Sequence, residues 1–183
     1  MKTPEQLVAL LSGAWTIYNQ TSVYPNGTAV PRAPDAAQGP NGTGVILCPS
    51  SFPLHLFLTN RPKDHPTMQM SAILTPTLPA YRPHNLTYGK FDNTTDADWA
   101  ILGKHNLAYA APFTLTVLPE EDNDDGVVVH GPLLSNVPSY DGAFFKRNFT
   151  IIGEGEEYGK WLRLVIRNET SGVRNLVVWR KRG

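Results

Sequence analysis

Apolar and polar residues alternate with a period of two along much of this chain, which is the spacing of side chains on one face of a β-strand. In residues 107–118 one face is formed by Tyr109, Ala111, Phe113, Leu115 and Val117, and the other face is also partly apolar, with Ala108, Ala110 and Pro112. Comparable stretches rich in aromatic and β-branched residues, separated by turn-forming residues, predict about ten strands. They lie at 15–24, 44–48, 52–59, 68–74, 86–92, 107–118, 127–134, 143–152, 161–168 and 174–181.

Two short stretches break the alternation and predict helices. Near the start, Thr3 and Gln6 are spaced as a capping box with proline at the first helical position, and an apolar stripe from Leu7 to Leu11 follows. The second stretch, 96–104, begins with acidic residues at the positive end of a helix dipole.

About ten strands joined by short turns, with few helices and no βαβ repeat, predict an all-β fold. Several strands carry apolar residues on both faces, so we expect a closed antiparallel β-barrel of about eight to ten strands. A β-sandwich interaction module with a filled interior is the alternative. At 183 residues, the chain is expected to form one domain spanning 1–183.

Charge and cysteine content narrow the class of protein. The 16 basic and 16 acidic residues cancel, so we expect no nucleic-acid partner. No stretch approaches the roughly 20 apolar residues that span a bilayer. With a single cysteine, Cys48, and no signal-peptide pattern at the start, we expect a cytoplasmic protein. Sequons point the other way, toward secretion; they lie at Asn19, Asn26, Asn41, Asn85, Asn93, Asn148 and Asn168.

The most informative polar residue is Arg147. Phe145, Phe149 and Ile151 share its strand face, so alternation directs a guanidinium into an apolar interior. An unpaired buried charge is costly, and Arg147 therefore needs a carboxylate, several carbonyls, or an anionic or carbonyl-bearing ligand. An internal salt bridge, or a shifted register that places Arg147 outside, is the competing interpretation.

His130 lies on the preceding strand, which is expected to pair with the strand of Arg147. A neutral imidazole can exchange a proton near neutral pH, so His130, Arg147 and Tyr109 are the candidate catalytic residues. Candidate ligand contacts come from aromatic side chains expected at the interior or at its mouth: Tyr88, Trp99, Phe113, Phe145 and Phe149. Each of these aromatic residues could equally serve packing alone.

Other chemistries find little support in the sequence. The five histidines are scattered along the sequence, so we expect no metal site. The sequence contains no nucleotide-binding loop and no nucleophile elbow, and we therefore expect no cofactor. The acidic stretch 122–126 lacks the distant glutamate of a calcium loop and is interpreted as a solvated hairpin tip. Cys48 lies in an apolar strand and is expected to be an inert core thiol.

Three stretches spread over the chain resemble the lipocalin-like domain family of bacterial and fungal proteins. They are the Gly13-Ala14-Trp15 opening, the pair 106–113 and 127–130, and the closing stretches 142–147 and 176–180. The resemblance implies a calycin-type barrel with a ligand in its interior. We also expect Trp15 to seal one end of the barrel, with Arg180 over its indole ring.

Relatives of this kind are associated with secondary metabolite biosynthesis, so the resemblance implies a small hydrophobic ligand and a cofactor-free cyclase, isomerase or dehydratase. The alternative is a non-catalytic carrier of the same kind of molecule. A catalyst needs several polar groups converging on one point, and the expected proximity of Arg147 and His130 favours the enzyme. A monomer or a homodimer is equally compatible with the sequence.

Overall fold

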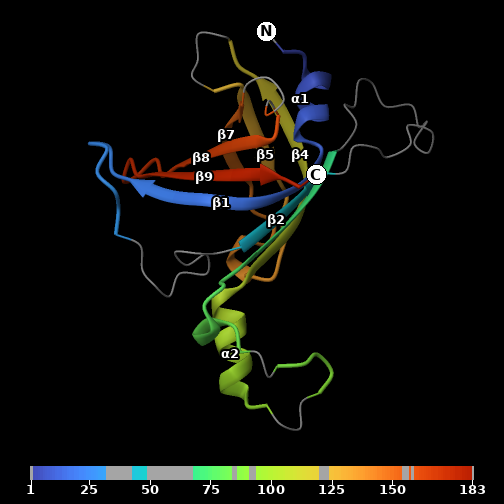
Figure 1. The fold of residues 1–183 in the computed structure, drawn as a ribbon, viewed down its shortest axis with the longest axis vertical. Helices are drawn as coiled ribbons and strands as arrows, with labels where there is room; N and C mark the ends of the chain where they lie inside the picture. Colours follow the sequence, from blue (N-terminus) through green and yellow to red (C-terminus); the bar gives the residue numbers. More distant parts are fainter. Residues whose placement is uncertain are drawn as a thin grey trace, which may run out of the picture.

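A computed structural model describes residues 2–31, 43–48, 68–83, 86–90, 94–119, 124–153, 157 and 159–182. It is mostly β-structure with two α-helices (Figure 1). The elements are α1 (Pro4–Leu11), β1 (Gly13–Val23), β2 (Thr43–Cys48), β3 (Met68–Thr75), η1 (Pro79–Tyr81), α2 (Asp96–His105), β4 (Leu107–Val117), β5 (Gly126–His130), β6 (Leu134–Ser135), η2 (Pro138–Tyr140), β7 (Phe145–Ile152), β8 (Trp161–Arg167) and β9 (Arg174–Lys181).

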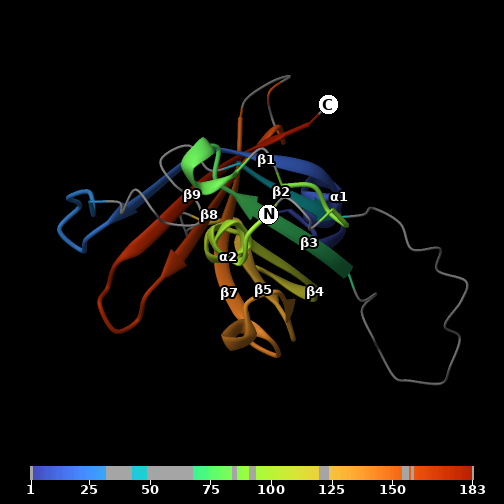
Figure 2. The same ribbon diagram turned by 90° about the horizontal axis from the view of Figure 1, so that it is seen from below.

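The strands form an antiparallel barrel, as predicted. Their order is β3-β2-β1-β9-β8-β7-β5-β4, and β3 pairs in turn with β4, so the ladder of hydrogen-bonded strands returns to its first member. The β3–β4 ladder runs from Met68 opposite Phe113 to Leu74 opposite Leu107. Figure 2 shows the strands arranged around the barrel, with α2 at the near end.

The connection between β5 and β7 departs from a simple hairpin. The strand predicted at 127–134 ends at His130, because Gly131 adopts φ +146° and turns the chain away. A side chain at Gly131 would also meet the ring of Phe144. The chain returns briefly as β6, which pairs with Tyr109 and Ala110 on β4. Segment 131–144 therefore leaves the barrel wall between β5 and β7.

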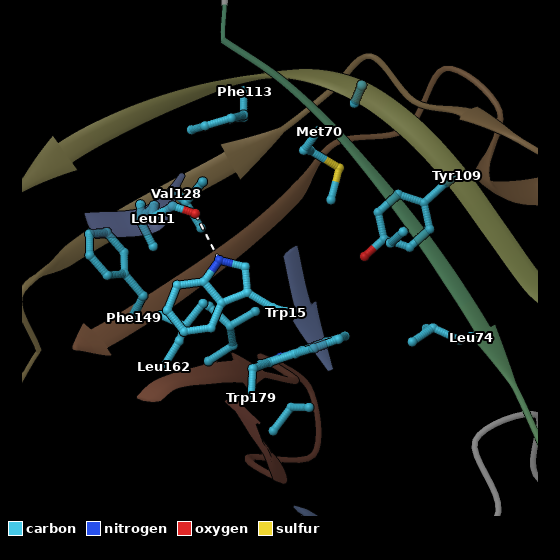
Figure 3. Packing of buried hydrophobic residues seen from close by; sticks show 14 of the residues in the cluster. Leu11, Trp15, Met70, Leu74, Tyr109, Phe113, Val128, Phe149, Leu162 and Trp179 are labelled. Carbon is cyan, nitrogen blue, oxygen red and sulfur yellow. Dashed lines mark hydrogen bonds between the residues drawn. The ribbon is translucent and has the colours of Figure 1, made fainter. Parts of the chain in front are cut away.

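The first helix and strand meet at a buried tryptophan. The capping box of Thr3 and Gln6 forms as predicted. Trp15 is fully buried, and its Nε1 donates a hydrogen bond of 2.8 Å to the carbonyl oxygen of Leu11 (Figure 3). This bond fixes the end of α1 to the start of β1.

The prediction that Arg180 lies over the Trp15 ring is wrong by one residue. Lys181, and not Arg180, pairs with Trp15 and places Nζ 5.2 Å from the centre of its ring. Arg180 points to the outer face, where its Cζ lies 5.4 Å from the ring centre of Trp161. Because neighbouring strand residues face opposite ways, a shift of one position exchanges the two cations.

Apolar side chains from several strands face the interior and alternate with outward-facing residues. Figure 3 shows Met70 and Leu74 of β3 facing Phe149 of β7, Leu162 of β8 and Trp179 of β9 across the core. Burying side chains of this size stabilises the fold by about 1.5–3 kcal/mol each.

Two further sequence interpretations are corrected. The strand predicted at 86–92 is a turn over the described part, 86–90, where Thr87 and Lys90 form an isolated bridge around Gly89 with φ +77°. In the acidic stretch, Asp124 and Asp125 are partly buried and accept hydrogen bonds from side chains and from the backbone of β7, whereas 122–123 lie outside the described residues. The strand predicted at 52–59 and the side chain of Cys48 lie outside the described residues.

Across the part of the chain that the structure describes, no helix combines the length and apolar character needed to cross a membrane.

Candidate functional site

Strand β7 directs Arg147 into the barrel. Its inward residues are Phe145, Arg147, Phe149 and Ile151, whereas Lys146 is exposed on the other face. The Arg147 side chain is only 9% exposed. The predicted register is therefore correct, and the alternative that placed Arg147 outside is excluded.

Strand β5 brings His130 next to this position. In the ladder, Val128 lies opposite Arg147 and His130 lies opposite Phe145, so His130 and Arg147 are diagonal neighbours on the inner face. Such diagonal neighbours lie about 7–8 Å apart at Cα, within reach of a long side chain. His130 is 5% exposed, and Nδ1 has no hydrogen-bond partner among the described residues.

Aromatic rings enclose Arg147 and His130. The Arg147 Cζ atom lies 4.6 Å from the centre of the Phe145 ring. The edges of two tyrosine rings also approach Phe145, with centroid distances of 5.6 Å for Tyr109 and 5.2 Å for Tyr140. The Tyr109 hydroxyl points into the core (Figure 3). The two phenols therefore approach the guanidinium from β4 and from η2.

Burial sets the protonation of both basic groups. Desolvation, with a smaller effect from the Arg147 charge, lowers the pKa of His130 to about 3, so the imidazole is neutral at physiological pH. Burial also lowers the pKa of Arg147, and interactions with Tyr109 and Tyr140 oppose that shift. A guanidinium keeps its proton under all ordinary conditions. The site thus holds a cation, a neutral imidazole and two phenols.

The predicted internal salt bridge to Arg147 is not present among the described residues. Asp124, the carboxylate bonded to β7, contacts Asn148 and Thr150, which face outward. Two candidate explanations from the sequence remain for the buried charge: carbonyl groups or a ligand. No backbone carbonyl bonded to Arg147 is found in the described part either.

The other predicted ligand contacts divide into two groups. Phe113 packs its ring edge on His130 at a centroid distance of 6.1 Å, and Phe149 is fully buried on the Arg147 face of β7. Tyr88, by contrast, is 94% exposed in the turn that replaces the predicted strand, so it does not line the interior. Trp99 is half-buried on α2 at one end of the barrel and donates a hydrogen bond to Thr94.

Tyr140 is the site residue that sequence reasoning missed. It lies in a loop, where no strand periodicity indicates which way a side chain points. Backbone bonds of Leu133 with Gly142 and Ala143 close the base of this loop, which places Tyr140 against Phe145. Its side chain is 38% exposed, so the cluster extends from buried Arg147 to the surface.

A metal centre is not indicated. Among the described residues, no group of three or more His, Cys, Asp or Glu side chains could hold a metal ion.

The model of a lipocalin-like domain family matches residues 65–182. Among solved structures, the chain is similar to a redesigned β-barrel with 10% sequence identity and a TM-score of 0.40, and the match covers 96% of this chain and 95% of that chain. No curated protein matches the chain.

Proposed function

The chain belongs to the lipocalin-like domain family, and on that premise we propose that its barrel binds a small, largely apolar organic molecule and catalyses a cofactor-free cyclisation, isomerisation or dehydration on it. The observation that supports the proposal is the closeness of three polar groups among buried apolar residues: Arg147 and Tyr109 both contact Phe145, and His130 lies opposite Phe145 on the neighbouring strand. A cytoplasmic role in secondary metabolism remains part of this proposal.

Each residue has a distinct role in an isomerisation. Arg147 lies beside the substrate carbonyl and stabilises the negative charge that develops on its oxygen when a neighbouring C–H bond breaks. The proton leaves to the neutral imidazole of His130 and returns to a different carbon, directly or through the Tyr109 hydroxyl, as the electron pair moves back from the oxygen. The apolar wall, including Phe113 and Phe149, confines the substrate in one conformation.

A non-catalytic carrier is the second candidate, and one observation favours it. The lowered pKa of His130, about 3, makes its imidazole a weak base, whereas an efficient general base has a pKa near the working pH. In the carrier, Arg147 and the tyrosines would orient a polar end of the ligand without proton transfer.

Binding and turnover, measured together, separate these functions. Binding is measured by displacement of the fluorescent probe N-phenyl-1-naphthylamine by apolar ketones of polyketide or terpenoid type, and turnover by mass spectrometry and NMR of the same ketones. Loss of turnover with retained binding in Arg147→Leu and His130→Ala supports catalysis. Binding without turnover in the unaltered protein supports the carrier, and unchanged binding and turnover in both variants would remove these residues from the site.

A further inference from the structure

The charge of Arg147 is not balanced within the part of the barrel that is described. Its side chain is more than nine-tenths buried, and its guanidinium lies over the face of the Phe145 ring. A cation–π contact recovers about 2 kcal/mol when desolvated, whereas removing an ion from water costs several kcal/mol even after the protein relaxes. The aromatic ring therefore offsets only part of the cost of burying Arg147.

Among the residues that the structure describes, no carboxylate is paired with Arg147, and the polar groups that face it are a histidine and two tyrosines. They are the phenols of Tyr109 and Tyr140 and the imidazole of His130, on three different elements. Because His130 is neutral, it neither cancels the charge of the guanidinium nor adds a second positive charge. A neutral carbonyl at this position would accept a hydrogen bond but would not cancel the charge.

Carboxylates are available nearby but are directed to the opposite face of the strand. Asp124 is bonded to Asn148 and Thr150 and lies 3.4 Å from Arg163, and Asp125 is bonded to Lys2 and to the backbone of Ile151. Alternation along β7 separates these acids from Arg147. Among the described residues, Asp124 and Asp125 therefore pair with Arg163 and Lys2, and neither pairs with Arg147.

We infer that the ligand of this barrel is an organic acid: an apolar body that carries one oxyanion, such as a carboxylate, bound by the guanidinium of Arg147 with the Tyr109 and Tyr140 hydroxyls as further donors. The planar guanidinium presents paired N–H groups that match a carboxylate. The inference rests on the proposed binding of a small, largely apolar molecule and narrows its ligand class to organic acids. In such a ligand the carboxylate takes the place beside Arg147 that the proposed function gives to a ketone oxygen.

A pair of ligands that differ only in charge tests the inference on the unaltered protein. Decanoate and 1-decanol share one chain length, and each competes with N-phenyl-1-naphthylamine, which is uncharged. At pH 7.5 we expect decanoate to displace the probe at a concentration about tenfold or more below that of decanol, since one charge-assisted pair supplies that much. At pH 4, where the ligand carboxyl becomes largely protonated, the preference shrinks.

Arg147→Met and Lys146→Met form a matched pair of variants. Each removes one positive charge from β7, but Arg147 faces the interior and Lys146 faces outward. We expect Arg147→Met to reduce the preference for decanoate over decanol to within about twofold, whatever its own affinity for the neutral probe. Lys146→Met should keep the full preference. If Arg147→Met does not fold, the pH comparison on the unaltered protein decides.

The outcomes separate the inference from the proposed function. If the neutral probe does not bind the unaltered protein, both fail. If the probe binds but decanoate displaces it no better than decanol, the organic-acid inference fails and binding of an apolar molecule stands. A decanoate preference that survives in Arg147→Met also overturns the inference, because the anion is then held elsewhere.

Discussion

The guanidinium of Arg147 lies on the face of Phe145, two residues earlier on the same inner face of β7, with Cζ 4.6 Å from the ring centre. Phe145 also receives the ring edges of Tyr109 and Tyr140. One phenylalanine therefore contacts both the cation and the two tyrosine rings. This arrangement places polar atoms at a defined point of an apolar interior, which is what selective binding of a small molecule requires.

Arg147 should lower the stability of the ligand-free protein. Among the described residues no carboxylate pairs with this buried cation. Such a cation costs more than an apolar side chain of similar size, so we expect Arg147→Met to raise the free energy of unfolding by about 1–3 kcal/mol. Urea denaturation followed by circular dichroism measures the change. The exposed control Lys146→Met should stay within about 0.5 kcal/mol. A loss of several kcal/mol in Arg147→Met would instead reveal a paired charge.

His130 should make stability depend on pH. Its pKa is about 3 in the folded state, below the ordinary 6.5, so between these values the unfolded chain binds a proton that the folded chain does not. Stability is therefore fully present above about pH 6.5 and falls toward pH 3, by a few kcal/mol at about 1.4 kcal/mol for each pKa unit.

The imidazole signals of His130 in NMR spectra check this directly, and they should not titrate between pH 5 and 8. His130→Phe should flatten the decline of stability with acid relative to the unaltered protein. An imidazole that titrates near pH 6.5 would show that His130 is solvated, contrary to its burial.

Asp125 should stabilise the junction between the β4–β5 turn and β7. Its carboxylate accepts hydrogen bonds of 2.6 Å from Lys2 Nζ and from the backbone N–H of Ile151. Asp125→Asn removes the charge from both interactions, so we expect a loss of about 1–3 kcal/mol in urea denaturation. Glu169→Gln, in an exposed turn, is the control and should be neutral. Equal results for the two variants would restore the interpretation of this stretch as a solvated tip.

Gly126 should not tolerate a side chain. A Cβ atom there would lie 2.5 Å from the carbonyl oxygen of Thr116 and 2.7 Å from the Phe149 ring. The clash involves backbone and a fully buried ring, so we expect Gly126→Ala to destabilise by about 1–3 kcal/mol. Gly103→Ala, in α2 with open space around it, should instead stabilise by up to about 1 kcal/mol. Thermal unfolding of both variants tests the contrast.

Periodicity predicted the inner face of β7 and the neighbourhood of Arg147 and His130, because side chains on a strand alternate strictly and consecutive strands pair. It failed where other effects decide. The apolar residues near Tyr88 suggested a strand, but Gly89 favours the turn that exposes the tyrosine. Arg180 and Lys181 were exchanged because composition alone does not fix a one-residue register.

Tyr140 illustrates a different limit. Its position depends on hydrogen bonds between residues 133 and 143, which close a loop in a way that no local pattern encodes. The pairing of β4 with β3, β5 and β6 could likewise not be read from the alternation of one strand, since it depends on where neighbouring strands end.

Segment 131–144 leaves the barrel wall, so the strands that stabilise the fold are distinct from the loop that contributes Tyr140 to the candidate site. The ring of eight paired strands does not depend on the length of this segment, yet the segment delivers Tyr140 to the site. Insertions or deletions there would change the groups around Arg147 while every ladder of the ring stayed intact. Evolution, or a protein engineer, could thus diversify specificity on this scaffold by editing a single loop.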